Sequence, residues 1–181
     1  MRGLLGIAAA SNLGVAVTTV AIQGWNSGGA HAAARNTARF SCLVVAFAAP
    51  GLARMVRGLP AGARLVRAFV AAHLVHFAVV AALIASFERA HLAEKPGQSA
   101  AVLLIGFSLV VGLGIMAMPR VSRLYTSAHR GMLYLVFLIF FLAFAHNAVK
   151  PLRLMAVLLA GALLLRLAAA AQNLWNPQNA R

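Results

Sequence analysis

The feature that most constrains this chain is an apolar stretch at residues 66–87, VRAFVAAHLVHFAVVAALIASF, which carries two histidines. A helix rises about 1.5 Å per residue, so about 20 apolar residues are enough to cross a bilayer. An imidazole placed in hydrocarbon loses its hydrogen bonds to water, and this loss is costly unless another partner replaces them. His73 and His76 therefore need partners within the membrane.

Long apolar runs recur along the whole chain. Hydrophobic residues make up 62% of the 181 positions, against roughly half in a soluble domain. The runs predict an all-α polytopic membrane protein, built as one six-helix transmembrane domain. The predicted spans are residues 4–22, 37–56, 66–87, 100–118, 127–148 and 154–171. Residues 23–36, which include three glycines, are expected to form a loop in which His31 is solvated. Glycines in the fourth span, Gly106, Gly112 and Gly114, would let a neighbouring helix or a flat cofactor approach closely.

The first span follows Arg2, as the apolar core of a signal peptide would. The run is about 19 residues long, which is longer than a usual signal core, so we expect it to remain as the first helix. Cleavage near residues 30–34 is the alternative, and it would leave five spans.

The basic residues set the expected orientation. The formal charge is +14, from sixteen Lys and Arg against two carboxylates, Glu88 and Glu94. The basic residues gather at the ends of the apolar runs, where lipid headgroups hold them, and no basic stretch is interleaved with aromatic residues as nucleic-acid binding requires. An orientation with both termini inside places ten of the sixteen basic residues in inner segments, so we expect this topology. We also expect membrane lipid as a partner, and we expect no binding of nucleic acid.

The few thiols and carboxylates exclude several kinds of chemistry. Cys42 is the one cysteine, so neither a disulfide within the chain nor a site built from cysteines can form, and we expect a small buried apolar side chain. The two carboxylates fall near one loop, which argues against a paired-carboxylate hydrolase and against a Ca²⁺ or Mg²⁺ site.

Depth in the membrane decides which histidines can meet. His73 follows Arg67 by six residues, and His129 follows Arg123 by six. If both spans begin at these arginines on the inner side, the two imidazoles come to a matched depth, about 9 Å past each arginine. His76 lies one turn deeper than His73 and can replace it.

Two imidazoles at one depth suit a bis-histidine haem, in which the iron takes one neutral imidazole on each axial face. A zinc site would need further ligands that this region lacks. Arg67, Arg123 and Arg130 can then meet the haem propionates, or they serve only topology and lipid contact. In the alternative reading, the histidines hydrogen-bond neighbouring helices in a haem-free membrane scaffold or small transporter component.

Three stretches resemble the ferric-reductase-like transmembrane domain family, which includes the haem-binding membrane subunit of the bacterial methionine sulfoxide reductase system. They are TARFSCLVVAFAAPGLARMV, RAFVAAHLVHF and RLYTSAHRGMLYLVFLIFF, and the similarity covers about residues 36–144. The resemblance implies a six-helix bundle in a bacterial inner membrane that holds haem b non-covalently and passes electrons. It gives His73 the role of ligand on the third span and His129 that on the fifth, with His76 as the substitute for His73.

The chain departs from the two-haem members of that family, which carry a second histidine about four turns further along both helices. Here Leu142 and Phe87 stand near those positions, and His146 is the one candidate for an outer haem, so we expect a single haem near the cytoplasmic side. No GxGxxG stretch follows a strand, and the chain has no flavin or nicotinamide domain. A redox partner, a quinol or a flavoprotein, is therefore expected for any oxidoreductase activity.

Overall fold

The computed structural model describes residues 2–48, 62–88, 96–118, 121, 126–146 and 150–175. Every regular element in these ranges is helical, which confirms the predicted all-α class for this part of the chain. The elements are α1 (Arg2–Gln23), α2 (Ser27–Ala48), α3 (Gly62–Leu83), which continues into the π-helix η2 (Ile84–Glu88), α5 (Pro96–Met116), α7 (Thr126–Ala145) and α8 (Lys150–Trp175).

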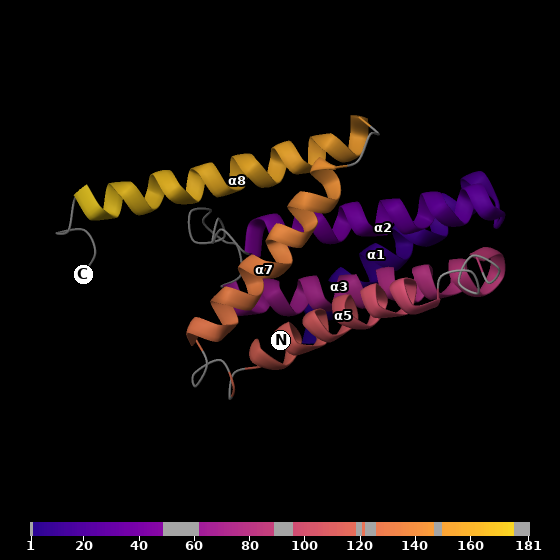
Figure 1. Ribbon diagram of the computed structural model, residues 1–181, viewed down its shortest axis with the longest axis horizontal. Coiled ribbons are helices and arrows are strands. Elements are labelled where there is room, and N and C mark those ends of the chain that lie inside the picture. The colour runs from indigo at the N-terminus through magenta and orange to yellow at the C-terminus, as the bar shows by residue number, and fades with distance from the viewer. Residues whose placement is uncertain are drawn as a thin grey trace.

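The helices form one bundle with a crossing member. α1, α2 and α3 pack against one another and α5 lies along α3, whereas α7 runs diagonally across the bundle to meet α8 (Figure 1). The apolar core lies between α2, α3, α5, α7 and α8, and four of these helices each supply a fully buried side chain: Val45, Phe69, Leu113 and Leu159. The diagonal course of α7 decides which of its residues lies opposite α3.

The predicted loop at residues 23–36 is wrong, because only residues 24–26 separate α1 from α2. Gly24, at a φ of 76°, ends α1 in the left-handed conformation that glycine adopts without strain. The side-chain oxygen of Asn26 accepts a hydrogen bond of 3.0 Å from the Gly29 N–H and so caps α2. The alanines that follow are strong helix formers, so α2 begins about ten residues before the predicted second span.

Glycines on α5 allow it to lie close to α3, as the sequence predicts. A Cβ added at Gly114 would come within 3.0 Å of Val70 Cγ1, which is tighter than ordinary van der Waals contact. A Cβ at Gly106 would meet the ring of Phe77 at 3.6 Å, which is an ordinary distance. The helix pair is therefore tight at Gly114 and relaxed two turns away.

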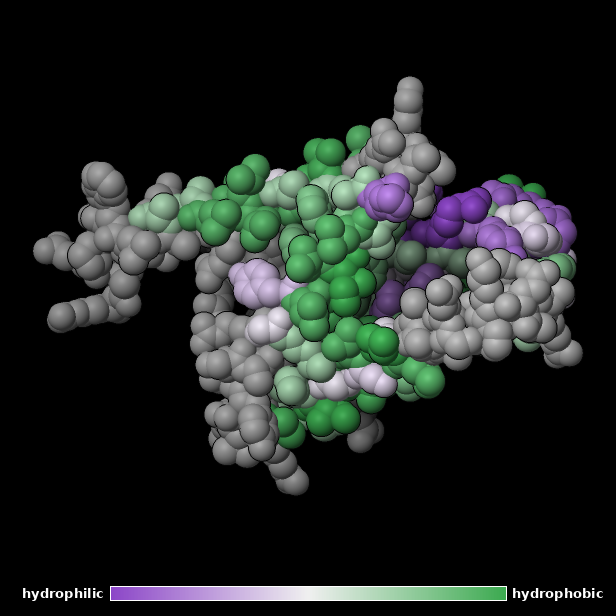
Figure 2. Space-filling view, in the orientation of Figure 1, coloured by the Kyte–Doolittle hydropathy of each residue, from purple (hydrophilic) through white to green (hydrophobic). Residues whose placement is uncertain are grey.

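Two helices, Gly3–Gln23 and Arg64–Glu88, are long and apolar enough to cross a membrane. Only 22% and 28% of their most apolar windows is buried inside the protein, whereas the core helix of a soluble protein is mostly buried. Large apolar side chains face outward, with Ile7 63% and Leu104 64% exposed. Figure 2 shows hydrophobic residues over the middle of the molecule and polar ones at the end where α1 and α2 meet. This exposure supports association with a membrane.

Among the described residues, the other apolar helical stretches are shorter than these two helices. The structure therefore leaves the prediction of six spans untested. These stretches are Leu104–Met116, Gly131–Ala145 and Leu154–Leu165.

Candidate functional site

His73 and His76 lie one turn apart on α3, and their ring centroids are 4.9 Å apart. Both line an open pocket of about 370 Å³ between α2, α3 and α7, here called the histidine pocket. His73 is 8% exposed, and desolvation of this kind favours the neutral imidazole that binds metals. The structure therefore brings two of the sequence-predicted ligands together on one wall of one pocket.

The other walls of the histidine pocket are mainly apolar. Ala34 and Ala38 form the α2 wall, and their small side chains leave the space open. Phe140 and Phe144 form much of the α7 wall, and Arg35, an exposed residue of α2, also lines the pocket. An apolar slot with a few convergent polar groups is typical of a cofactor site.

Aromatic rings surround His73. Phe69 stacks on it at 5.3 Å between centroids, while Phe77 and Phe140 approach edge-on at 4.8 Å and 5.1 Å. Nδ1 of His73 is buried and has no hydrogen-bond partner among the described residues. A buried polar atom left in this way costs about 1–3 kcal/mol. The ring is therefore well packed, but no acceptor among the described residues fixes the orientation of its Nδ1.

His76 differs from His73, because its Nδ1 and the Thr37 Oγ1 share a hydrogen bond of 3.0 Å. Thr37 belongs to a buried polar cluster that joins the first three helices. Nδ2 of Asn12 donates to the Ala72 carbonyl at 2.7 Å, and it also lies 3.3 Å from the Thr37 carbonyl and 3.4 Å from the Ser41 Oγ. Sequence reasoning missed this cluster, although the four-residue spacing of Thr37 and Ser41 and the asparagine within an apolar run are its signals.

The second predicted ligand lies elsewhere on α7. His129 and Arg130 are in the first turns of that helix, and their side chains lie outside the described residues. The α7 residue in contact with His73 is Phe140, which is eleven residues, or about 16 Å of helix, after His129. The pairing of His73 with His129 stays a prediction, and the described register of α7 does not bring the backbone of His129 to the histidine pocket.

The predicted propionate partners also lie apart from the histidine pocket or outside the described residues. Arg67 precedes His73 by six residues, about 9 Å along α3, and is not among the residues that line the pocket. Arg123 lies outside the described residues. Arg35, which the sequence did not single out, is the basic residue that lines the pocket.

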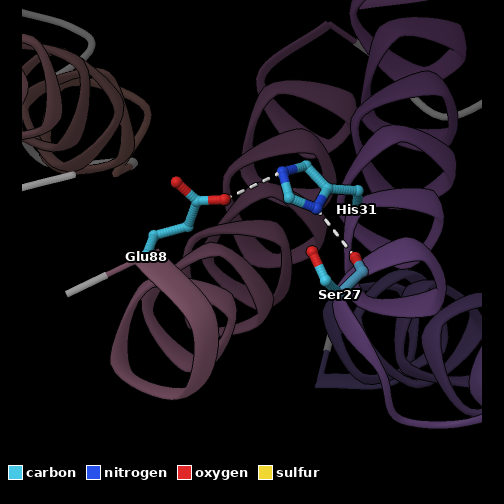
Figure 3. Close-up of polar contacts among 3 residues, drawn as sticks. All are labelled: Ser27, His31 and Glu88. Carbon is cyan, nitrogen blue, oxygen red and sulfur yellow. Dashed lines mark hydrogen bonds and ion pairs between the residues drawn. The ribbon is translucent and has the colours of Figure 1, made fainter. Parts of the chain in front are cut away.

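His31 was expected in a solvated loop, but it lies on α2 and joins that helix to η2 (Figure 3). Its Nδ1 donates to the Ser27 carbonyl at 2.7 Å, and its Nε2 lies 3.2 Å from the Glu88 carboxylate. The negative charge of Glu88 lies near the N-terminus of α2, where the helix dipole favours it. His146, at the end of α7, is exposed.

The donor set favours haem over a bare metal ion. Among the described residues, no group of three or more His, Cys, Asp and Glu side chains is placed to hold a metal. Haem iron already has four porphyrin nitrogens and needs only axial ligands from the protein, so one or two imidazoles suffice. The imidazoles of His73 and His76, the mainly apolar lining and Arg35 are compatible with such a group.

Comparison with known proteins finds no matching protein-family model, no matching curated protein and no matching solved structure. Membership of the ferric-reductase-like family stays a prediction from the three sequence stretches that resemble it.

Proposed function

We propose that this chain is an integral membrane protein that binds a b-type haem in the histidine pocket and passes electrons to a partner. The observation that carries the proposal is the pair of imidazoles on the wall of an apolar pocket that also contains a guanidinium. A haem has a flat apolar macrocycle, an iron that takes imidazole, and two carboxylates that pair well with arginine. The histidine pocket offers a counterpart to each of these three features.

Six residues that line the histidine pocket have stated roles in this proposal. His73 and His76 offer imidazoles to the iron, and Arg35 replaces the predicted arginines as the partner of a propionate. Ala34 and Ala38 leave room for the macrocycle, and Phe140 excludes water from it. When bound, the haem supplies one-electron redox chemistry.

The number of imidazoles that bind the iron is the feature of this site that a spectrum must determine. Ligation by His129, as the family resemblance implies, requires a register of α7 other than the one described, because Phe140 occupies the position opposite His73. A bis-histidine haem is low-spin, and a haem with a single imidazole is high-spin. The absorption spectrum therefore distinguishes a pair of ligands from a single ligand.

The membrane part of the proposal comprises six spans with both termini on the cytoplasmic side. The exposed apolar surface and the excess of basic residues in the inner segments support it. A haem near the inner face would exchange electrons with a quinol or a flavoprotein. Any oxidoreductase activity then belongs to the chain together with that partner.

The test is the haem content and the reduced absorption spectrum of protein purified from cells supplied with haem. The wild-type chain is expected to carry about one haem per chain, and the double variant His73→Ala/His76→Ala is expected to lose it. His146→Ala removes an exposed histidine and is the matched control that should retain the haem. His129→Ala should convert a low-spin spectrum to high-spin only if His129 is the second ligand. A wild-type protein without haem, or a double variant that retains it, would overturn the proposal.

The second candidate is the haem-free membrane scaffold or small transporter component. One observation favours it: Thr37 already satisfies a nitrogen of His76, so this histidine has a structural role without any cofactor. In that case the wild-type protein carries no haem, and the double histidine variant unfolds at a lower temperature because a buried helix-to-helix contact is lost.

A further inference from the structure

The hydroxyl of Thr37 is fully buried between α2 and α3 and has three neighbours within hydrogen-bond distance. Its Oγ1 lies 2.9 Å from the Ala33 carbonyl, 3.0 Å from the Ala34 carbonyl and 3.0 Å from Nδ1 of His76. A hydroxyl has one proton to donate and two lone pairs that accept. A backbone carbonyl can only accept, so the hydroxyl proton points back along α2 toward the two alanines.

It follows that the lone pairs of the Thr37 hydroxyl remain for His76, and that Nδ1 of His76 donates. A neutral imidazole with its proton on Nδ1 has its free lone pair on Nε2. Histidines that bind metals typically have this arrangement, in which one ring nitrogen binds the metal and the other donates to a fixed acceptor. His73 lacks such an acceptor, since its Nδ1 has no partner among the described residues.

The position of Thr37 is itself fixed by the polar cluster around it. Its backbone carbonyl lies 3.3 Å from Nδ2 of Asn12, and it also accepts a hydrogen bond of 3.1 Å from the Ser41 hydroxyl. Asn12 simultaneously holds the Ala72 carbonyl on α3, at 2.7 Å. The threonine hydroxyl is thus held in register with α3 by a third helix.

We infer that Thr37 is a positioning residue that fixes the tautomer of His76, so that Nε2 of His76 rather than His73 is the α3 ligand of the iron. This inference rests on the proposed haem site and reverses the order of the two histidines that the sequence predicts. An acceptor on Nδ1–H makes the imidazole a stronger donor, which favours ferric over ferrous iron. Thr37 would therefore influence the reduction potential as well as the retention of haem.

The test compares Thr37→Val, which has nearly the same shape but no hydroxyl, with Thr37→Ser, which restores the hydroxyl. Thr19→Val is the matched control, because Thr19 is also buried and also donates to a backbone carbonyl, while its other hydrogen bond among the described residues comes from Asn36 and not from a histidine. Thr37→Val is expected to bind ferric haem about 10–100-fold more weakly. If ferrous affinity is unchanged, each tenfold loss raises the midpoint potential by about 59 mV. Thr37→Ser and Thr19→Val should stay close to wild type in both measurements.

A second measurement needs neither haem nor a stable Thr37→Val protein. In haem-free wild-type protein labelled with ¹⁵N-histidine, the nitrogen shifts of His76, assigned by comparison with His76→Ala, should show a proton on Nδ1. A proton on Nε2 would overturn the inference even if haem binds. Retention of haem by His76→Ala and its loss from His73→Ala would overturn it as well. A wild-type protein with the expected tautomer but without haem would instead overturn the proposed function and leave the tautomer assignment intact.

Discussion

Asn12 provides a quantitative test of how the first three helices are held together. Its side chain is fully buried and spans α1, α2 and α3. Two substitutions separate its polar contribution from its volume: Asn12→Leu removes the amide but fills the space, and Asn12→Ala removes both. The difference between the free energies of unfolding of these two variants measures the contribution of the side-chain volume.

The hydrogen bonds of Asn12 set the expected change in the free energy of unfolding. Nδ2 has two hydrogens and three acceptors within reach, of which the Ala72 carbonyl at 2.7 Å is the best, so at most two hydrogen bonds are lost. Hydrogen bonds between membrane helices contribute on average about 0.6 kcal/mol each, and at most about 1.7 kcal/mol. Against this, Oδ1 of Asn12 is buried without a partner among the described residues, which costs about 1–3 kcal/mol.

These opposing contributions nearly cancel. Asn12→Leu should therefore change the free energy of unfolding by less than about 1 kcal/mol. Asn12→Ala adds a void of about two to three methyl groups, which costs about 2–3 kcal/mol at roughly 1 kcal/mol for each methyl group. Asn12→Ala should therefore be the less stable of the two variants by about 2 kcal/mol.

The assay is reversible unfolding by sodium dodecyl sulfate in mixed micelles, followed by circular dichroism. The reasoning is refuted if Asn12→Leu loses 2 kcal/mol or more, because the amide would then be worth far more than its hydrogen-bond lengths indicate. Equal stability of Asn12→Ala and wild type would refute the packing part of the calculation, since it would mean that no void remains.

Three further predictions concern the glycines of α5, the histidine pocket and the ion pair of Glu88. Gly114→Ala should destabilise the α3–α5 contact by about 1–3 kcal/mol, because the added Cβ would lie 3.0 Å from a valine methyl group. Gly106→Ala, with 3.6 Å to its neighbour, should raise stability by up to about 1 kcal/mol in the same unfolding assay with sodium dodecyl sulfate. Ala38→Leu should narrow the histidine pocket and lower the haem-to-protein ratio without lowering the unfolding temperature. Glu88→Gln removes an ion pair with His31 whose side chains are 30% and 41% exposed, so the loss should be below about 1 kcal/mol and smaller still at high salt.

Each of these predictions has a contradicting result. Equal effects of the two glycine substitutions would mean that α5 does not approach α3 as described. For the pocket, Ala21→Leu on the exposed side of α1 is the control, and a loss of haem in that variant as well would point to misfolding. For the ion pair, a salt-independent loss above about 2 kcal/mol would show that Glu88 acts as a buried charge.

Hydropathy alone predicted the helical class and the approximate positions of the helices, because an apolar run of sufficient length has few other ways to satisfy its backbone. It failed at the start of α2, where three glycines and several polar residues were interpreted as a loop. The cap at Asn26 and the alanines that follow determine that boundary, and neither contributes a hydropathy signal.

The site was predicted only in part. The two histidines of α3 share a face because they are three positions apart on a helix, and this follows from helical geometry alone. The depth argument for His129 assumed that α3 and α7 begin at one level and run alongside each other. α7 instead crosses the bundle, and its crossing is set by packing such as Phe140 against His73, which a one-dimensional pattern does not contain (Figure 1).

The division of the histidine pocket between early and late helices has a consequence for biosynthesis. Both imidazoles, the threonine and the asparagine belong to α1, α2 and α3, which leave the ribosome first and hold one another by polar contacts. The aromatic wall arrives only with α7, roughly fifty residues after α3 has been made. A nascent chain therefore has both imidazoles arranged while one side of the histidine pocket is still open, and the arrival of α7 would complete its wall.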